Sequence, residues 1–189
     1  MSFITQRSCL LAAGRGRRAG GPKAWLVHDG RTLLETQLAF LLRHFEPSGI
    51  AVSIQEDWLT RCLAIHSGVR WVPVDPDAPA LASLQALLRA GPPRSWAFLH
   101  HVDMPVWEDA LFAALSRAAE ESPEVEALIP TRGGRGGHPI LLSRSVVAAV
   151  TALDPLQDRL DHWLQGRKAL RLELPFDCIL ENWNSQPHP

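Results

Sequence analysis

Short apolar runs alternate along this chain with longer stretches in which apolar positions recur at helical spacing. The first pattern predicts buried strands and the second predicts amphipathic helices. The expected strands are Ser8–Ala12, Ile50–Ile54, Val69–Val74, Trp96–Val102, Val125–Pro130, His138–Leu142 and Ala169–Leu174. Near-continuous apolar strands alternating with helices are typical of an α/β fold with a mostly parallel sheet covered on both faces.

The helix boundaries are marked by capping and breaking residues. A capping box, Thr32-Leu-Leu-Glu35, predicts the start of a helix that reaches Phe45 and is stopped by Pro47-Ser-Gly. Asp154 is expected as the N-cap of a later helix, with Pro155 in its first turn. The remaining expected helices are Asp57–Ile65, Ala80–Ala90, Val106–Glu121, Ser145–Leu153 and Asp154–Leu164.

Composition places the chain among ordinary globular proteins. Its 189 residues, 46% apolar and 21% charged, predict one domain over residues 1–189. The three cysteines, Cys9, Cys62 and Cys178, are far apart, which disfavours a disulfide framework or a zinc site. No basic segment leads an apolar stretch at the N-terminus, and no apolar run is long enough to span a bilayer. We therefore expect a cytoplasmic protein without membrane contact.

The net charge is −1, but the charges are unevenly distributed and two zones of the chain are basic. Residues 1–28 contain no acidic residue, and neither do residues 127–153. The basic residues of these zones are Arg7, Arg15, Arg17, Arg18, Lys23, Arg132, Arg135 and Arg144. Two local basic zones, each rich in glycine, suit a small polyanion better than a nucleic acid.

The stretch LLAAGRGRRAGGPKAWL, from Leu10 to Leu26, follows the first expected strand. Glycines at this point let backbone N–H groups approach a phosphate closely. The segment satisfies the loose dinucleotide pattern GxGxxA, but Gly20-Gly21-Pro22 breaks the helix that this motif needs. The P-loop pattern GxxxxGK[ST] is absent. Clustered cations on a glycine backbone favour a triphosphate; the alternative is a solvated basic loop.

The stretch SWAFLHHVDMPVW predicts a buried strand that ends at Asp103. A carboxylate at the carboxyl end of a strand can hold Mg²⁺ together with phosphate oxygens. The alternative is that Asp103 caps the helix expected from Val106. His100 and His101 point to opposite faces of the strand, and each is expected to be structural.

LAAGRGRRAGGPKAWL resembles the signature LAxGxGxRxGxPK of the MobA-like nucleotidyltransferases, which act on the molybdenum cofactor, and the resemblance extends over nearly the whole chain. It implies a Rossmann-like three-layer α/β/α sandwich of the nucleotide-diphospho-sugar transferase type. It implies that Arg18, Lys23 and Asp103 are catalytic, and that Asp103, in a D-x-P turn, holds Mg²⁺ or Mn²⁺. The nucleoside triphosphate would contact Leu11, Ala12, Ala13, Gly14, Arg15, Gly16, Arg18 and Lys23.

Two later segments extend the resemblance. TRGGRGGHPILL, Thr131–Leu142, is similar to the family's acceptor-side passage and implies acceptor-binding roles for Arg135, Gly137 and His138; the alternative is a plain turn. ENWNSQP resembles the close of the guanylyltransferase branch, which implies that Asn184 completes the metal shell. The Pro and acidic residues of that close are absent here, and the alternative is a frayed terminus.

The features that indicate the base disagree. Ala13, which gives LAAG, is similar to the cytidylyltransferase branch, whereas Asn182 and Asn184 are similar to the guanylyltransferase branch. The segment Ala78–Ser83 resembles the loop that contacts the base or acceptor in both, without its glycine. CTP is favoured, with GTP as the alternative.

The resulting hypothesis is a nucleotidyltransferase that passes a nucleoside monophosphate to a phosphomonoester and releases pyrophosphate. The resemblance implies molybdopterin or its molybdenum form as the acceptor, and transient contact with molybdoenzyme maturation proteins. The alternatives are a sugar- or polyol-phosphate nucleotidyltransferase, a non-catalytic nucleotide-binding maturation partner, and an NAD-dependent oxidoreductase.

Overall fold

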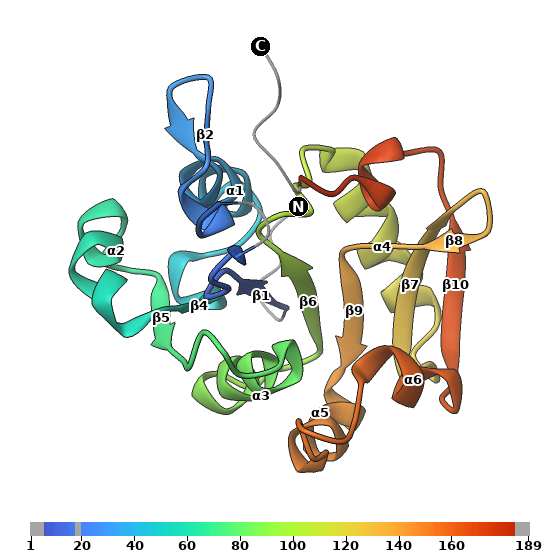
Figure 1. Ribbon diagram of the computed structural model, residues 1–189. Coiled ribbons are helices and arrows are strands. Elements are labelled where there is room, and N and C mark those ends of the chain that lie inside the picture. Colours follow the sequence, from blue (N-terminus) through green and yellow to red (C-terminus); the bar gives the residue numbers. More distant parts are fainter. Residues whose placement is uncertain (1–5, 18–19, 184–189) are drawn as a thin grey trace.

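The computed structural model describes residues 6–17 and 20–183, and an eight-stranded sheet runs through its centre (Figure 1). The strand order is β10-β7-β9-β6-β1-β4-β5, and β8 pairs with β7 outside this path. The strands of this sheet are β1 (Arg7–Leu11), β4 (Ile50–Ile54), β5 (Arg70–Pro73), β6 (Trp96–His101), β7 (Ala127–Arg132), β8 (Arg135–Gly136), β9 (Ile140–Ser143) and β10 (Ala169–Glu173).

Most neighbouring strands of the main path are parallel, which confirms the expected class of sheet. The β6, β1, β4 and β5 strands run parallel to one another, and β10 runs parallel to β7. Strand β9 is antiparallel to both β6 and β7. Because parallel neighbours end on the same side, the carboxyl ends of β1, β4, β5 and β6 share one edge, where α/β sheets bind their ligands.

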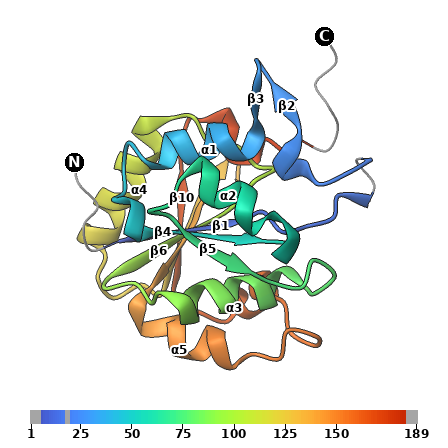
Figure 2. The same ribbon diagram turned by 90° about the vertical axis from the view of Figure 1, so that its left-hand side faces the viewer.

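Helices cover both faces of the sheet and make the three-layer sandwich (Figure 2). Helices α1, α2 and α4 lie on one face, and α3 and α5 lie on the other. The helices are α1 (Leu33–Leu41), α2 (Leu59–Ile65), α3 (Ala80–Ala90), α4 (Asp109–Glu121), α5 (Arg144–Ala152) and α6 (Leu160–Gln165). The short 3-10 segments are η2 (Lys23–Trp25), η3 (Pro47–Gly49), η4 (Glu56–Trp58) and η5 (Asp177–Leu180).

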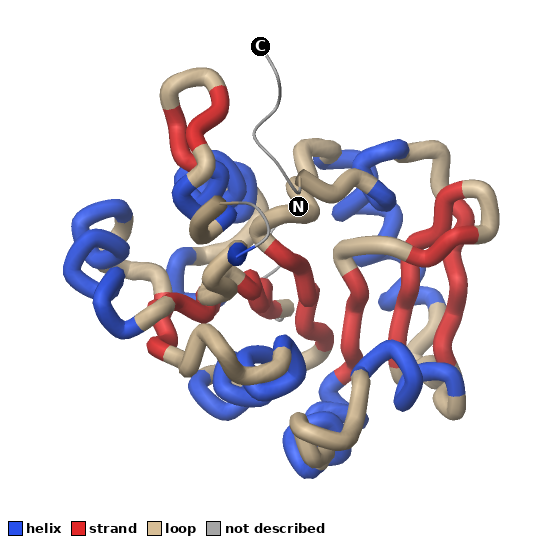
Figure 3. The backbone as a smooth tube through the Cα atoms, viewed as in Figure 1, coloured by secondary structure: helices blue, strands red, loops and turns tan. Residues whose placement is uncertain are grey.

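Two hydrophobic cores correspond to the two faces. The first contains residues of α1 and α4, with Phe98 of β6 stacked on Phe112 at 4.9 Å between ring centroids. The second contains residues of α3 and α5 together with Leu164 of α6. A separate hairpin, β2 (Val27–His28) and β3 (Arg31–Thr32), projects beyond α1 (Figure 3). None of the helices among the described residues is long and apolar enough to cross a membrane.

Several expected helix ends are wrong. The capping box at Thr32 and Glu35 is confirmed, but α1 ends at Leu41 and not at Phe45. Helix α4 begins at Asp109, and α6 begins at Leu160. Asp154 is not the N-cap of α6, because the N-cap is Arg159 and the Asp154 carboxylate instead accepts a hydrogen bond from Leu156 N at 2.9 Å in a separate turn.

His100 is fully buried in the middle of the sheet. Its Nε2 lies 2.8 Å from Ser8 Oγ, while its Nδ1 has no hydrogen-bond partner among the described residues. Burial lowers the pKa of His100 to about 3, since a charged imidazolium loses its hydration there. The ring is therefore neutral and structural.

Candidate active site

A cavity of about 680 Å³ opens at the carboxyl ends of β1, β4, β5 and β6. It brings together the glycine-rich loop, the segment after β5 and the turn after β6. Its lining residues are Leu11, Ala12, Ala13, Gly14, Arg15, Gly16, Arg17, Lys23, Ser53, Asp75, Pro76, Asp77, Ala78, Ala80, Ser83, His101, Val102 and Asp103. The cavity thus contains every described residue that was predicted to bind nucleotide.

Strand β4 anchors the start of the loop. Ala12 N donates to Ser53 O and Oγ at 3.2 Å, and Gln55 Nε2 donates to Ala13 O at 3.0 Å. The four amides from Ala13 to Gly16 donate to no other described residue. Backbone N–H groups in such a loop form a concave anion site, so the loop has the donors that phosphate oxygens need.

Gly16 is a position where only glycine fits. Its φ is +60°, and a Cβ placed there would lie 1.8 Å from Gly21 O. Gly21 N in turn donates to Gly16 O at 3.2 Å, so a backbone hydrogen bond joins these two glycines. Gly14 has open space around its Cβ position, which leaves room for a ligand.

Gly16→Ala is therefore expected to weaken triphosphate binding about tenfold or more, because the added Cβ forces the loop off Gly21 and misplaces its amides. Isothermal titration with each nucleoside triphosphate measures the change. Gly30→Ala is the matched control, since Gly30 has φ +75° in the β2–β3 turn but open space around its Cβ position. Equal affinity in the two variants would contradict the prediction.

Lys23 and Asp103 form an ion pair in the wall of the cavity. Lys23, in η2, places Nζ 2.5 Å from Asp103 Oδ2 in the turn after β6. Their side chains are 21% and 20% exposed, so the pair is partly shielded from water. The backbone of the turn is tied to the end of the described chain, because Trp183 N donates to Asp103 O at 2.7 Å. The predicted alternative role of Asp103 as a helix cap is wrong, since the N-cap of α4 is Glu108.

The donor set around Asp103 fits a magnesium ion that shares its ligands with a substrate. No cluster of three or more His, Cys, Asp or Glu side chains capable of holding a metal occurs in residues 6–17 and 20–183. One carboxylate beside a phosphate-binding loop is what Mg²⁺ uses when phosphate oxygens supply the other ligands. Asp103 would hold such an ion, and Lys23 would then turn toward the phosphates.

His101 and His138 meet at the edge of this cavity, with their ring centroids 4.8 Å apart in an edge-to-face contact. Burial lowers the pKa of His138 to about 4, and burial also lowers the pKa of His101, so both rings are neutral near pH 7. A second cavity of about 400 Å³ lies beyond them. It shares Leu11, Ala80 and His101 with the first cavity, and its other lining residues include His138, Arg159 and Leu160.

The other predicted site residues lie in different places. Arg135 is exposed on β8 and lines neither of these cavities. Gly137 packs against η5, where a Cβ would lie 1.9 Å from Ile179 O. Arg18 and Asn184 lie outside the described residues.

Sequence reasoning missed several polar residues of the cavity region, among them Arg17, Gln55, Asp75 and Asp77. Gln55 and Asp75 also line a neighbouring hollow of about 440 Å³ together with Glu56 and Asp57. The rule that singled out Asp103 would have found the two aspartates, because they follow β5 at its carboxyl end. The prolines around them were the stronger signal and indicated only a loop.

A doubly covered, mostly parallel sheet with a basic glycine loop at its carboxyl edge is typical of Rossmann-like α/β proteins that bind phosphate. Residues 8–172 match the model of the MobA-like NTP transferase domain. The chain belongs to this family of nucleotidyltransferases.

Individual proteins agree with this assignment. The chain is 26% identical over 156 residues to a protein of Halalkalibacterium halodurans named probable molybdenum cofactor guanylyltransferase, which covers 81% of this chain and 77% of that protein. It is 34% identical over 137 residues to the bifunctional enzyme IspD/IspF of a Bradyrhizobium strain, covering 67% of this chain and 33% of that one. The crystal structure of Rv0371c from Mycobacterium tuberculosis superposes with a TM-score of 0.74 at 25% identity, over 95% of this chain and 94% of that one.

Proposed function

We propose that the protein is a Mg²⁺-dependent enzyme that transfers a nucleoside monophosphate from CTP, or alternatively GTP, to the phosphate of molybdopterin or its molybdenum form. The observation that carries the proposal is the convergence of the loop amides, Lys23 and Asp103 on one cavity. Membership of the MobA-like family supports the reaction type.

In the proposed reaction, an oxygen of the acceptor's phosphomonoester attacks the α-phosphorus of the triphosphate, and the bond to the β,γ-pyrophosphate breaks. Phosphoryl chemistry of this kind depends on positioning and charge neutralisation, and it needs no covalent nucleophile. The amides from Ala13 to Gly16 would orient the phosphates. Lys23 and Arg18 would neutralise charge on the α-phosphate and on the departing pyrophosphate, where bound Mg²⁺ supplies further positive charge. Asp103 would hold Mg²⁺ or Mn²⁺, with Asn184 as a further ligand.

The hollow beside the loop suits the base of the nucleotide. It contains the carboxylates of Glu56, Asp57 and Asp75, which disfavour phosphate but accept hydrogen bonds from an exocyclic amino group. Cytosine and guanine both carry such a group. Ala13 favours CTP, whereas the relative named as a guanylyltransferase favours GTP.

The second cavity suits the organic part of the acceptor. Its walls are mainly apolar, and the neutral rings of His101 and His138 separate it from the phosphate-binding side. We assign acceptor binding to His138 on this ground, and we retain Arg135 and Gly137 from the family resemblance.

Pyrophosphate release tests the proposal. The protein is supplied with Mg²⁺, with CTP, GTP, ATP or UTP in turn, and with molybdopterin or a panel of sugar and polyol phosphates. Turnover with CTP or GTP and molybdopterin is the expected result. Turnover with a sugar phosphate would replace the acceptor, and nucleotide-dependent thermal stabilisation without turnover for any pair would indicate a binding protein.

A further inference from the structure

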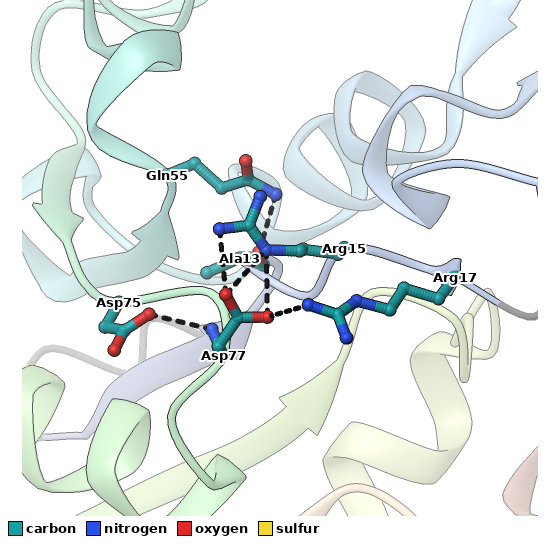
Figure 4. Close-up of polar contacts among 6 residues, drawn as sticks. All are labelled: Ala13, Arg15, Arg17, Gln55, Asp75 and Asp77. Atoms are coloured by element: carbon teal, nitrogen blue, oxygen red, sulfur yellow. Dashed lines mark hydrogen bonds and ion pairs between the residues drawn. The ribbon is translucent and has the colours of Figure 1, made fainter.

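One carboxylate binds both arginines that flank Gly16. Asp77, in the segment between β5 and α3, accepts hydrogen bonds from Arg15 Nε to both of its oxygens at 2.9 Å, and from Arg17 at 2.9 Å (Figure 4). A second guanidinium nitrogen of Arg15 lies 2.9 Å from Asp77 Oδ2. The contact joins two segments about sixty positions apart in the sequence.

This arrangement has the geometry of an anion held by a pair of guanidinium groups. Planar guanidinium forks bind carboxylate and phosphate oxygens in the same way. The Arg15 hydrogen bonds keep the pKa of the Asp77 carboxyl below its usual range, so the group stays charged near pH 7. The single carboxylate thus offsets part of the positive charge of the two arginines at the wall of the cavity that contains the loop amides.

The carboxylate is held ready for this contact by its own segment. Asp77 N donates to Asp75 Oδ1 at 2.9 Å, which fixes the backbone just before the side chain (Figure 4). Pro76 lies between these two residues and restricts the backbone further. Arg15, Arg17 and Asp77 all line the cavity, so a ligand that entered it would meet the ion pair directly.

We propose that the Asp77 carboxylate competes with the phosphates of the nucleotide for binding to Arg15 and Arg17. A polyphosphate must take Arg15 and Arg17 from the Asp77 carboxylate, and the ease of this exchange sets the protein's affinity for it. The inference rests on the proposed function to the extent that polyphosphate binds at this loop. Release of Asp77 also separates the β5–α3 segment from the glycine loop, so binding and movement of that segment are coupled.

The exchange is modest in size, because the contact is open to water. Arg15 and Asp77 are 46% and 47% exposed, and Arg17 is 77% exposed. Exposed ion pairs are weak, and salt screens them. Loss of the competing pair, together with the loss of one negative charge beside the incoming phosphates, corresponds to an affinity gain of about threefold to tenfold.

Inorganic pyrophosphate without added metal is the probe, because it needs neither the base nor Asp103 for binding. Calorimetric titration of the whole protein compares wild type, Asp77→Asn and Asp57→Asn. Asp57 is the matched control, since its charge raises the pKa of Arg15 but no hydrogen bond joins the two among the described residues. The expected result is a threefold to tenfold lower Kd for Asp77→Asn and less than a twofold change for Asp57→Asn.

A double variant shows whether Asp77 acts through its arginine partner. In an Arg15→Gln background, the gain from Asp77→Asn is expected to fall to less than half of its size. An unchanged Kd in Asp77→Asn, or an equal gain in Asp57→Asn, would overturn the inference while leaving nucleotidyl transfer intact. Failure of every variant to bind pyrophosphate would overturn both the inference and the proposed phosphate-binding role of the loop. Thermal unfolding of each variant confirms that the fold is retained.

Discussion

Asp103→Asn is expected to lower the rate of nucleotidyl transfer by about 10²–10³-fold, with little change in stability. The asparagine keeps the shape of the side chain but removes the charge that would hold the metal ion. It also removes the negative charge that Lys23 contacts at 2.5 Å. Initial rates of pyrophosphate release with the substrate pair found in the nucleotide panel measure the effect.

The control is Asp109→Asn at the first residue of α4. Asp109 is 63% exposed, forms an ion pair with Arg43 and a hydrogen bond with His44, and lines none of the cavities described above. Its replacement is expected to leave the rate within twofold of wild type. A rate for Asp103→Asn within threefold of wild type would remove this residue from the metal site. If no substrate pair turns over, the Mg²⁺-dependence of nucleotide binding provides the same comparison.

Acid is expected to destabilise the protein through His100. The folded-state pKa of about 3 lies below the unfolded value of about 6.5, so between these two values the unfolded chain binds the extra proton. The contribution of His100 to the free energy of unfolding is complete above about pH 6.5 and is lost as the pH falls toward the folded-state value. Between pH 7 and pH 4.5 this loss is about 3 kcal/mol. His138, with a pKa of about 4, acts in the same direction.

Urea unfolding at pH 7 and pH 4.5 measures this loss, with His100→Gln as the test variant. Glutamine cannot be protonated in this range and retains a polar group for Ser8. The difference in free energy between the two pH values is expected to shrink by about 3 kcal/mol in the variant. His162→Gln, at an exposed position of α6, is the control and should leave the difference unchanged. A wild-type pH difference in His100→Gln would show that another group carries the acid sensitivity.

The strands were predictable because a strand buried on both faces requires a short run of apolar residues. Strand β4 is apolar except for Ser53, and β6 is apolar from Trp96 to Leu99, since both faces of the sheet are covered; the bounds of both strands follow the buried runs closely. The direction of β9 was not predictable, because an apolar segment such as His138–Leu142 has the same pattern in either direction. The predicted start of helix α6 was wrong for a local reason. The Asp154 backbone N–H donates to Asp158 Oδ2 at 2.8 Å, so this segment forms a turn and the helix begins only at Leu160.

The position of the site was predictable, but its contacts were not. A glycine loop after β1 and an aspartate after β6 had to meet at one edge of a parallel sheet, and Lys23 and Asp103 do meet there. Asp77 pairs with Arg15 and Arg17 only because β5 also ends at that edge. This neighbour relation depends on strand order, which no local spacing encodes.

The antiparallel direction of β9 affects how the shapes of the two cavities can change independently of each other. Since β9 starts beside the end of β6, with Ile140 opposite Leu99, it returns His138 to the edge that β6 had already reached. Among the described residues, those that line the first cavity all lie within 11–103, whereas the second cavity is also lined by residues within 138–161. The residues of 138–161 that line the second cavity are therefore absent from the lining of the first. Substitutions within 138–161 can therefore reshape the second cavity without replacing a described residue that lines the first.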